Sequence, residues 1–223
     1  MITIRAPTAI LSALLCLGAC TKVHFQCKSV NPGSLSAEHG IVLLSNLQMP
    51  RHFDDNDFDK CIGSSMRSAN PGLLFVSAKQ FRENLYPYFT RSTTPDSLEG
   101  YKSILDKQGV QQRIATLGVR YLIVLEKSKT INDWHGGIFC GAGYGGAGCL
   151  GLSWWDRKSD FGLIIWDLQN KHLVGDMAAQ AAGTGIMPAL GLPVPLYVPA
   201  TESAVCKEMG IRLAEWLSGQ QLR

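Results

Sequence analysis

The chain has 223 residues, a formal net charge of +3, and 46% hydrophobic against 17% charged residues. This length suits one compact domain better than two, and the apolar content is sufficient to form a buried core. The basic residues are scattered along the chain, so the sequence gives no support for binding to nucleic acid or to another polyanion.

Residues 1–19 have the features of a bacterial signal peptide. Arg5 supplies the positive charge, and the apolar run from Ala9 to Leu17 is too short to span a bilayer as a helix. The run ends in Leu17-Gly18-Ala19-Cys20, which resembles the lipobox of bacterial lipoproteins. We therefore expect cleavage before Cys20 and acylation of its thiol. The alternative is an ordinary signal peptide cut at the same bond, with Cys20 left as a plain thiol.

Acylation would hold the mature chain on a membrane. Several acyl chains form a lasting anchor, at about 0.8 kcal/mol per buried methylene. Thr21 follows Cys20, where an aspartate would resemble a retention signal for the inner membrane, so we expect the periplasmic face of the outer membrane. Residues 20–39 show little apolar periodicity and predict an acylated tether, which leaves residues 40–223 as a single domain.

The domain opens with a strand at 41–44, a continuous apolar run of the kind that is buried on both faces. A short helix is expected next, with Phe58, Ile62 and Met66 on one face, ending before Asn70-Pro71-Gly72. Further strands are expected at 73–76 and 121–125, with two helical regions between them. The starts of these regions have capping-box spacing, and Gly118 ends the second; the boxes are Ser77 with Gln80 and Asp96 with Glu99.

The second half of the domain begins with a Gly-rich segment, 136–152, which we expect to be an insertion. Strands at 161–168 and 173–182 are joined by a tight turn, and a Pro-rich loop at 185–200 leads to a C-terminal helix capped by Thr201. Strands that alternate with helices and then follow one another predict an α/β fold. We expect a mixed sheet of about five strands, covered by helices, with the Gly-rich insertion before the last hairpin.

The cysteines predict disulfide bonds. Of the seven in the chain, Cys16 leaves with the signal peptide, and the oxidising periplasm favours pairing among the others that are not acylated. Cys140 and Cys149 bracket a flexible glycine-rich run, so a bridge between them closes a short loop. Cys61 and Cys206 both fall on expected helices and are the candidates for a second bridge. Cys27 would then be left over, but one sequence leaves the connectivity open.

Three passages carry a family resemblance. They are the strand Ile41-Val42-Leu43-Leu44, the passage from Leu117 to Ile123 into the central strand, and the strand-turn-strand from Ile164 to Val174. Their order resembles the TolB amino-terminal domain and lipoproteins built on it, including the curli secretion lipoprotein CsgG. The resemblance implies a sandwich of sheet and helices in the periplasm. Two positions depart from the family pattern, since Val119-Arg120 replaces alanine-aspartate and Asn170-Lys171 replaces threonine-glycine.

The Gly-rich segment and its flank also form the candidate contact loop. Ile138 to Trp155 combines aromatic and aliphatic residues with many glycines and has no charged residue. Aromatic residues are favoured at membrane interfaces, so this loop is a candidate for contact with membrane or protein. The alternative is a disulfide-stapled loop packed on its own domain. The candidate contact residues are Phe139, Tyr144, Leu150, Trp154 and Trp155.

Motifs for catalysis or cofactor binding lack the required context. Gly141 to Gly146 satisfies G-x-G-x-x-G, but no helix-forming run follows it, as a dinucleotide site requires. The acidic run Asp55, Asp57 and Asp59 lacks the glycine and the distal glutamate of a calcium loop. The histidines are dispersed, and no serine or cysteine stands in a nucleophile motif. We therefore expect no metal, no cofactor and no catalytic residues.

The sequence thus favours a non-enzymatic lipoprotein that is anchored through Cys20 and acts as an envelope binding or assembly factor. Its expected partners are the membrane and either another envelope protein or further copies of itself. Two alternatives stay open: an oligomeric secretion-channel subunit of the curli-transport type, and a periplasmic domain that binds a small ligand or has enzymatic activity.

Overall fold

The computed structural model describes residues 21–29, 39–45, 59–90, 92–95 and 97–219. The signal peptide, Cys20 and the acidic run before Asp59 therefore lie outside the described residues. Contacts divide the chain into two compact units, where we expected one domain over residues 40–223. Unit 1 comprises 1–23, 130–159 and 181–204, and unit 2 comprises 24–129, 160–180 and 205–223.

The strands form one sheet in the order β1-β6-β5-β4-β2-β3. Parallel and hairpin-connected strands both occur in it, so the predicted α/β fold with a mixed sheet is confirmed. The strands are β1 Lys22–Ser29, β2 Gly40–Ser45, β3 Phe75–Val76, β4 Val119–Gly143, β5 Gly146–Asp167 and β6 His172–Pro193.

The parallel part of the sheet lies in unit 2. β2 pairs with β3 from Ile41↔Phe75 and with β4 from Gly40↔Val119 to Ser45↔Leu125. All six residues of β2 are buried, as the continuous apolar run predicts for a strand covered on both faces. Gly40 is required at its position, because a Cβ there would lie 2.6 Å from the Gly118 carbonyl oxygen.

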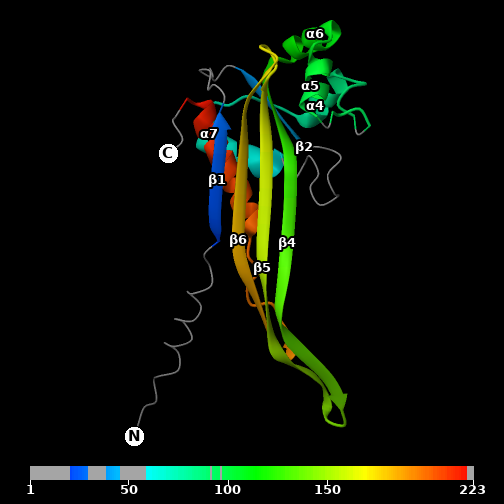
Figure 1. The fold of residues 1–223 in the computed structure, drawn as a ribbon, viewed down its shortest axis with the longest axis vertical. Coiled ribbons are helices and arrows are strands. Elements are labelled where there is room, and N and C mark those ends of the chain that lie inside the picture. The colour runs from blue at the N-terminus through cyan, green and yellow to red at the C-terminus, as the bar shows by residue number, and fades with distance from the viewer. Residues whose placement is uncertain (1–20, 30–38, 46–58, 91, 96, 220–223) are drawn as a thin grey trace. The chain divides into compact units, whose positions relative to one another are not determined.

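Three helices of unit 2 cover one face of its sheet, and they lie together beside the start of β4 in Figure 1. They are α4 Ala78–Asn84, α5 Leu98–Leu105 and α6 Gln108–Leu117. Their apolar side chains form one core with Val42, Leu122 and Trp166 of the strands. Gly118 ends α6 as predicted, with a φ of 65° in the left-handed region.

The other face of the unit 2 sheet is covered by η1 Asp59–Gly63, α3 Ser64–Ala69 and the part of α7 (Thr201–Leu217) that belongs to this unit. Gly210 allows the close approach of α7 to α3, since a Cβ there would lie 2.5 Å from the Ser65 Cβ. A disulfide joins Cys61 of η1 to Cys206 of α7, with the Cα atoms 5.7 Å apart. The structure therefore has helices on both faces of the sheet in unit 2.

Several boundaries differ from the expected ones. Lys22–Ser29, assigned to a tether from its weak periodicity, is the edge strand β1 beside β6. The Gly-rich segment is not an insertion, because 136–143 continues β4 and 146–152 begins β5. β6 likewise runs through Pro193 into the segment expected to be a Pro-rich loop. Glycine and proline were read as strand breakers, but glycine is tolerated in an antiparallel hairpin and proline at a strand end.

Of the three expected helix caps, one is confirmed, and Thr201 is the first residue of α7 instead of its cap. Ser77 caps α4, and its Oγ accepts a hydrogen bond from the Gln80 amide. At α5 the cap is Ser97, whose Oγ accepts from the Gly100 amide, and not Asp96 as expected. Both residue types cap helices well, so the spacing alone could not decide between neighbours.

Candidate contact surface

The end of the β4–β5 hairpin carries the candidate contact residues. The two strands are joined by Tyr144 and Gly145, and a disulfide links Cys140 of β4 to Cys149 of β5. The Cα atoms of these cysteines are 4.0 Å apart, so the bridge fastens opposite positions of the two strands. The structure thus has both disulfides that the sequence suggested, and Cys27 is free.

Aromatic rings pair across the base of this hairpin. Trp134 of β4 and Trp155 of β5 are stacked with ring centroids 4.7 Å apart. On the neighbouring positions, the His135 and Trp154 rings are stacked at 6.1 Å. Gly185 of β6 lies directly against the Trp155 ring, because a Cβ at that position would overlap it. β6 therefore packs against this pair of stacked tryptophan rings and buries Trp155.

Four of the five expected contact residues are exposed. Phe139 is 82% exposed, Tyr144 116%, Leu150 67% and Trp154 40%. Trp155 is only 5% exposed, so its assignment to the contact surface is wrong. In a strand successive side chains point to opposite faces, and a segment read as a loop gives no way to tell these faces apart.

The exposed apolar surface extends beyond the predicted residues. Apart from Leu74 and Tyr86, every large apolar side chain that is exposed among the described residues belongs to unit 1. The additions come from β4, from β5 and from β6 with the segment after it. They are Ile131, Trp134, Leu152, Ile186, Leu190, Leu192, Val194, Leu196 and Val198.

Charged residues stop at the base of this surface. No Asp, Glu, Lys, Arg or His occurs over 136–155 or over 181–200. At the boundary, the His135 Nε2 lies 3.7 Å from a carboxylate oxygen of Asp156 and 3.9 Å from one of Asp133. The other Asp156 oxygen accepts a hydrogen bond from Thr184 of β6 at 2.7 Å. Polar groups therefore tie the three strands together where the charge-free part of unit 1 begins.

A second polar cluster in unit 1 fixes the start of α7. The Glu202 carboxylate accepts hydrogen bonds from Arg157 at 2.9 Å and from the Thr130 hydroxyl at 2.8 Å. The hydroxyls of Ser159 and Thr201 are both fully buried and lie 2.8 Å apart. These contacts satisfy buried polar groups and hold strand and helix together, so a structural role accounts for them.

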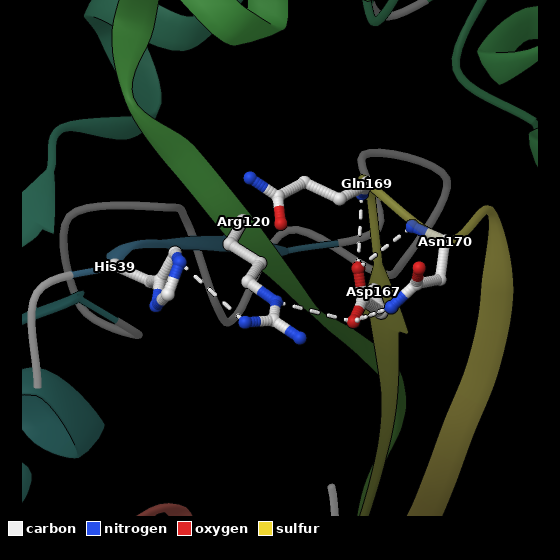
Figure 2. A network of polar contacts seen from close by, with 5 residues as sticks. All are labelled: His39, Arg120, Asp167, Gln169 and Asn170. Atoms are coloured by element: carbon white, nitrogen blue, oxygen red, sulfur yellow. Dashed lines mark hydrogen bonds and ion pairs between the residues drawn. The ribbon is translucent and has the colours of Figure 1, made fainter. Parts of the chain in front are cut away.

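The most buried carboxylate of unit 2 is also structural. Figure 2 shows Asp167, at the end of β5, surrounded by donors. One oxygen accepts from the amides of Gln169 and Asn170, and the other from the Asn170 side chain and from Arg120 Nε. His39 lies 3.4 Å from the guanidinium of Arg120. Burial raises the pKa of Asp167. The hydrogen bonds from Asn170 and Arg120 lower it by a larger amount, so the pKa is below its usual value.

This arrangement makes Asp167 unsuited to proton transfer, because a carboxylate with its lone pairs occupied and its pKa lowered stays ionised. Arg120 is the ion-pair partner of Asp167 at 3.2 Å, and Asn170 closes the turn through both its amide and its side chain.

The other motifs considered for a metal, dinucleotide or thiol site form none of these sites among the described residues. No group of three or more His, Cys, Asp or Glu side chains in this part of the chain could hold a metal ion. The G-x-G-x-x-G stretch crosses a strand-to-strand turn, which gives none of the helix-start amides that a pyrophosphate needs. Burial raises the pKa of the Cys27 thiol, and the charge of Asp176 raises it further, so the thiolate is disfavoured. Within the described residues, no helix is long and apolar enough to cross a membrane.

Comparison with known proteins gives a weak structural likeness. No protein-family profile and no curated protein sequence match the chain. Among solved structures, the PelC dodecamer from Paraburkholderia phytofirmans is similar, with 10% identity, 90% of this chain and 100% of that chain covered, and a TM-score of 0.44. A variant PelC dodecamer from the same organism has 9% identity, the same coverage and a TM-score of 0.43. Likeness at this level establishes neither a family nor a function.

Proposed function

We propose that the chain is a non-enzymatic lipoprotein of the bacterial envelope, held by acyl groups on Cys20 at the periplasmic face of the outer membrane. Its unit 1 contacts that membrane through the charge-free surface of β4, β5, β6 and the segment that follows. The observation that carries the proposal is that unit 1 combines exposed apolar side chains, two charge-free stretches at 136–155 and 181–200, and Thr21, the residue after Cys20.

The surface fits lipid better than water. Exposed side chains such as Phe139 and Leu190, at 82% and 84%, would each be stabilised by leaving water. A monomeric soluble protein rarely keeps a contiguous apolar surface of this kind unless it binds something. Tyrosine and tryptophan, here Tyr144, Trp134 and Trp154, are the residues favoured where a membrane meets water.

The anchor adds an independent reason for choosing the membrane. Thr21, the residue after Cys20, belongs to unit 1, and a Cβ on Gly183 of β6 would lie 3.5 Å from the Thr21 hydroxyl. One residue spans at most about 3.6 Å. A lipid on Cys20 therefore keeps unit 1 at the bilayer surface, where its local concentration is high.

We favour contact of unit 1 with the membrane–water interface over insertion of the β4–β5 hairpin of a single protein copy across the bilayer. Among the described residues, the pairing of β4 with β2 ends at Leu125, whereas β4 continues to Gly143. Backbone groups on an unpaired strand edge cost several kcal/mol each in hydrocarbon. The interface still offers water to these groups, so unit 1 can lie there without further partners.

The same strand edge supports a second candidate, self-association through unit 1 in an oligomeric secretion-channel subunit. The end of this edge, residues 136–143, carries no charge, and an uncharged strand edge is a template for pairing with another chain. The mass of the detergent-extracted protein separates the candidates. A monomer favours the interface contact, whereas a closed oligomer favours the channel subunit.

The membrane contact is tested with the acylated protein in liposomes that contain brominated phosphatidylcholine. We expect bromine to quench the fluorescence of Trp134 and Trp154, and the Trp134→Phe/Trp154→Phe double variant to lose most of this quenching. Trp166 and Trp216 are buried in unit 2 and serve as internal references. Two results together would contradict the membrane contact: no quenching of the wild-type protein, and a protein adduct formed in intact cells by a photocrosslinker placed at Phe139. The contact surface would then bind a protein partner instead of lipid.

The anchor is tested by the mass of the mature N-terminal peptide. We expect a peptide that begins at Cys20 and carries the added mass of diacylglycerol and a fatty acid. A peptide with the bare mass, or one that begins elsewhere, would refute the anchoring.

A further inference from the structure

A small hollow in unit 2 has the features of an anion site. It is lined by Leu43 of β2, Lys60 of η1, Arg67 of α3, and Phe75, Val76 and Ser77 at the end of β3, and its volume is about 210 Å³. In open α/β sheets, ligands bind beside the carboxyl ends of parallel strands. β3 ends at Val76, so the hollow occupies such a place.

Two cations face this hollow. Lys60 lies on η1 and Arg67 on α3, and both side chains line the hollow. Within the described part of the chain, neither side chain forms a hydrogen bond, and no carboxylate lies within 4.0 Å of either. Their positive charge is therefore not neutralised by any described residue.

The Arg67 guanidinium is held in place before any ligand binds. Its central carbon lies 4.8 Å from the centroid of the Phe75 ring, a cation–π arrangement. A Cβ on Gly63 would lie 3.4 Å from one guanidinium nitrogen, so the backbone at Gly63 also lies close to it. A fixed guanidinium loses less entropy on binding than a mobile one.

Ser77 supplies a neutral donor to the same hollow. Its Oγ already accepts the Gln80 amide at 3.2 Å, and among the described residues its hydroxyl hydrogen has no acceptor. The lining thus offers an ammonium, a guanidinium and a hydroxyl, but no carboxylate. Arginine and lysine together are suited to the several oxygens of a phosphate group.

We propose that the hollow between Lys60, Arg67 and Ser77 binds a phosphate group. Its volume is below the about 300 Å³ at which pockets for drug-sized ligands begin, so the bound part is small. The phosphate is either a free ion or the head of a phospholipid, and both present the same oxygens to the three donors. The site lies wholly in unit 2 and is independent of the contact surface of unit 1.

The test titrates the full-length acylated protein in neutral detergent, by calorimetry, with inorganic phosphate and separately with a water-soluble short-chain phosphatidylglycerol. We expect saturable binding of at least one ligand, and a dissociation constant raised about tenfold or more in Lys60→Ala/Arg67→Ala, because charge-assisted hydrogen bonds are lost. Arg67→Lys should weaken binding less than Arg67→Ala.

The matched control is Lys79→Ala/Lys102→Ala, which removes two exposed charges from helices of the same unit outside the hollow. It should leave the dissociation constant unchanged, and both double variants should unfold at the wild-type temperature, since all four side chains are exposed. Binding of inorganic phosphate identifies a free-ion site, and binding of phosphatidylglycerol alone identifies a headgroup site. Absence of saturation with both ligands, or equal weakening in both double variants, overturns the proposal.

Discussion

Lys171 has a backbone conformation that favours glycine. It lies in the turn between β5 and β6 with a φ of 55°, in the left-handed region that costs a residue with a Cβ about 1–2 kcal/mol. Its ammonium lies 3.4 Å from an Asp106 carboxylate oxygen, with both side chains partly exposed, so this ion pair contributes about 0–1 kcal/mol. A glycine at this position would adopt the same φ without this cost.

We therefore predict that Lys171→Gly raises the free energy of unfolding by about 0.5–1 kcal/mol, because relief of strain exceeds loss of the surface ion pair. Urea unfolding followed by fluorescence measures the change. Asp106→Ala is the control, since it removes the ion pair without changing the turn. If Lys171→Gly is as destabilising as Asp106→Ala, the strain does not matter.

Asp167 gives the fold a defined acid sensitivity. Its pKa is lower in the folded protein than the ordinary 3.8, so the ionised form stabilises the fold above that value. The contribution is complete at neutral pH and is lost as the pH falls below 3.8 through the folded-state pKa. Protonation removes an acceptor from Arg120 and the turn amides.

The corresponding variant is Asp167→Asn, which we expect to lower the free energy of unfolding at pH 7 by about 1–3 kcal/mol. Its stability should also fall less steeply than the wild type between pH 4 and pH 2. Asp133→Asn is the control, because that side chain is 75% exposed. Parallel pH profiles for the wild type and Asp167→Asn would contradict the assignment.

At the scale of elements, the sequence predicts buried strands well and exposed strands poorly. β2 and the start of β4 are continuous apolar runs, a pattern typical of a strand buried on both faces. The distal halves of β4, β5 and β6 are rich in glycine and exposed on their faces, so they show neither an apolar run nor regular alternation. Unit 1 therefore could not be recognised as sheet from periodicity.

The candidate site follows the same division. Its composition identified Phe139, Tyr144, Leu150 and Trp154, because aromatic residues without nearby charge are visible in any conformation. The sequence did not identify which residues of β6 belong to the contact surface. Their exposure depends on how β6 lies between β5 and β1, and β1 is distant in the sequence. The burial of Trp155 under Gly185 depends on the same pairing.

The packing of β6 against the stacked Trp134 and Trp155 rings leads to a prediction for this element. Gly185→Ala places a methyl group in the Trp155 ring, and overpacking of this kind costs about 1–3 kcal/mol. Near-ultraviolet circular dichroism should show the displaced tryptophan. Gly141→Ala is the matched control on β4, where a Cβ meets nothing within 4 Å and should leave the spectrum unchanged.

At the scale of the whole molecule, the two disulfides differ in the length of chain that they close. Cys61 and Cys206 are 145 positions apart, whereas Cys140 and Cys149 are 9 apart. A crosslink stabilises mainly by restricting the unfolded chain, and the restriction grows with the length of the loop. The chain-entropy relation gives about 5 kcal/mol for the long loop and about 2.5 kcal/mol for the short one.

We predict that Cys61→Ala/Cys206→Ala lowers the midpoint of urea denaturation more than Cys140→Ala/Cys149→Ala does. Reduction of the wild-type protein with dithiothreitol should give at least the larger of the two losses. An equal or reversed order would show that native-state contacts outweigh the entropy of the unfolded chain.

The edge strand β1 has a mechanical consequence. It begins at Lys22, two positions after Cys20, so a lipid on that cysteine has almost no slack. If Cys20 carries the proposed lipid, tension from the membrane is applied at the start of β1, and a pull along this strand acts across the hydrogen bonds that join β1 to β6. These hydrogen bonds are then loaded together in shear, and they do not break one after another. An anchor attached in this way should resist being torn from the fold when the envelope is stretched.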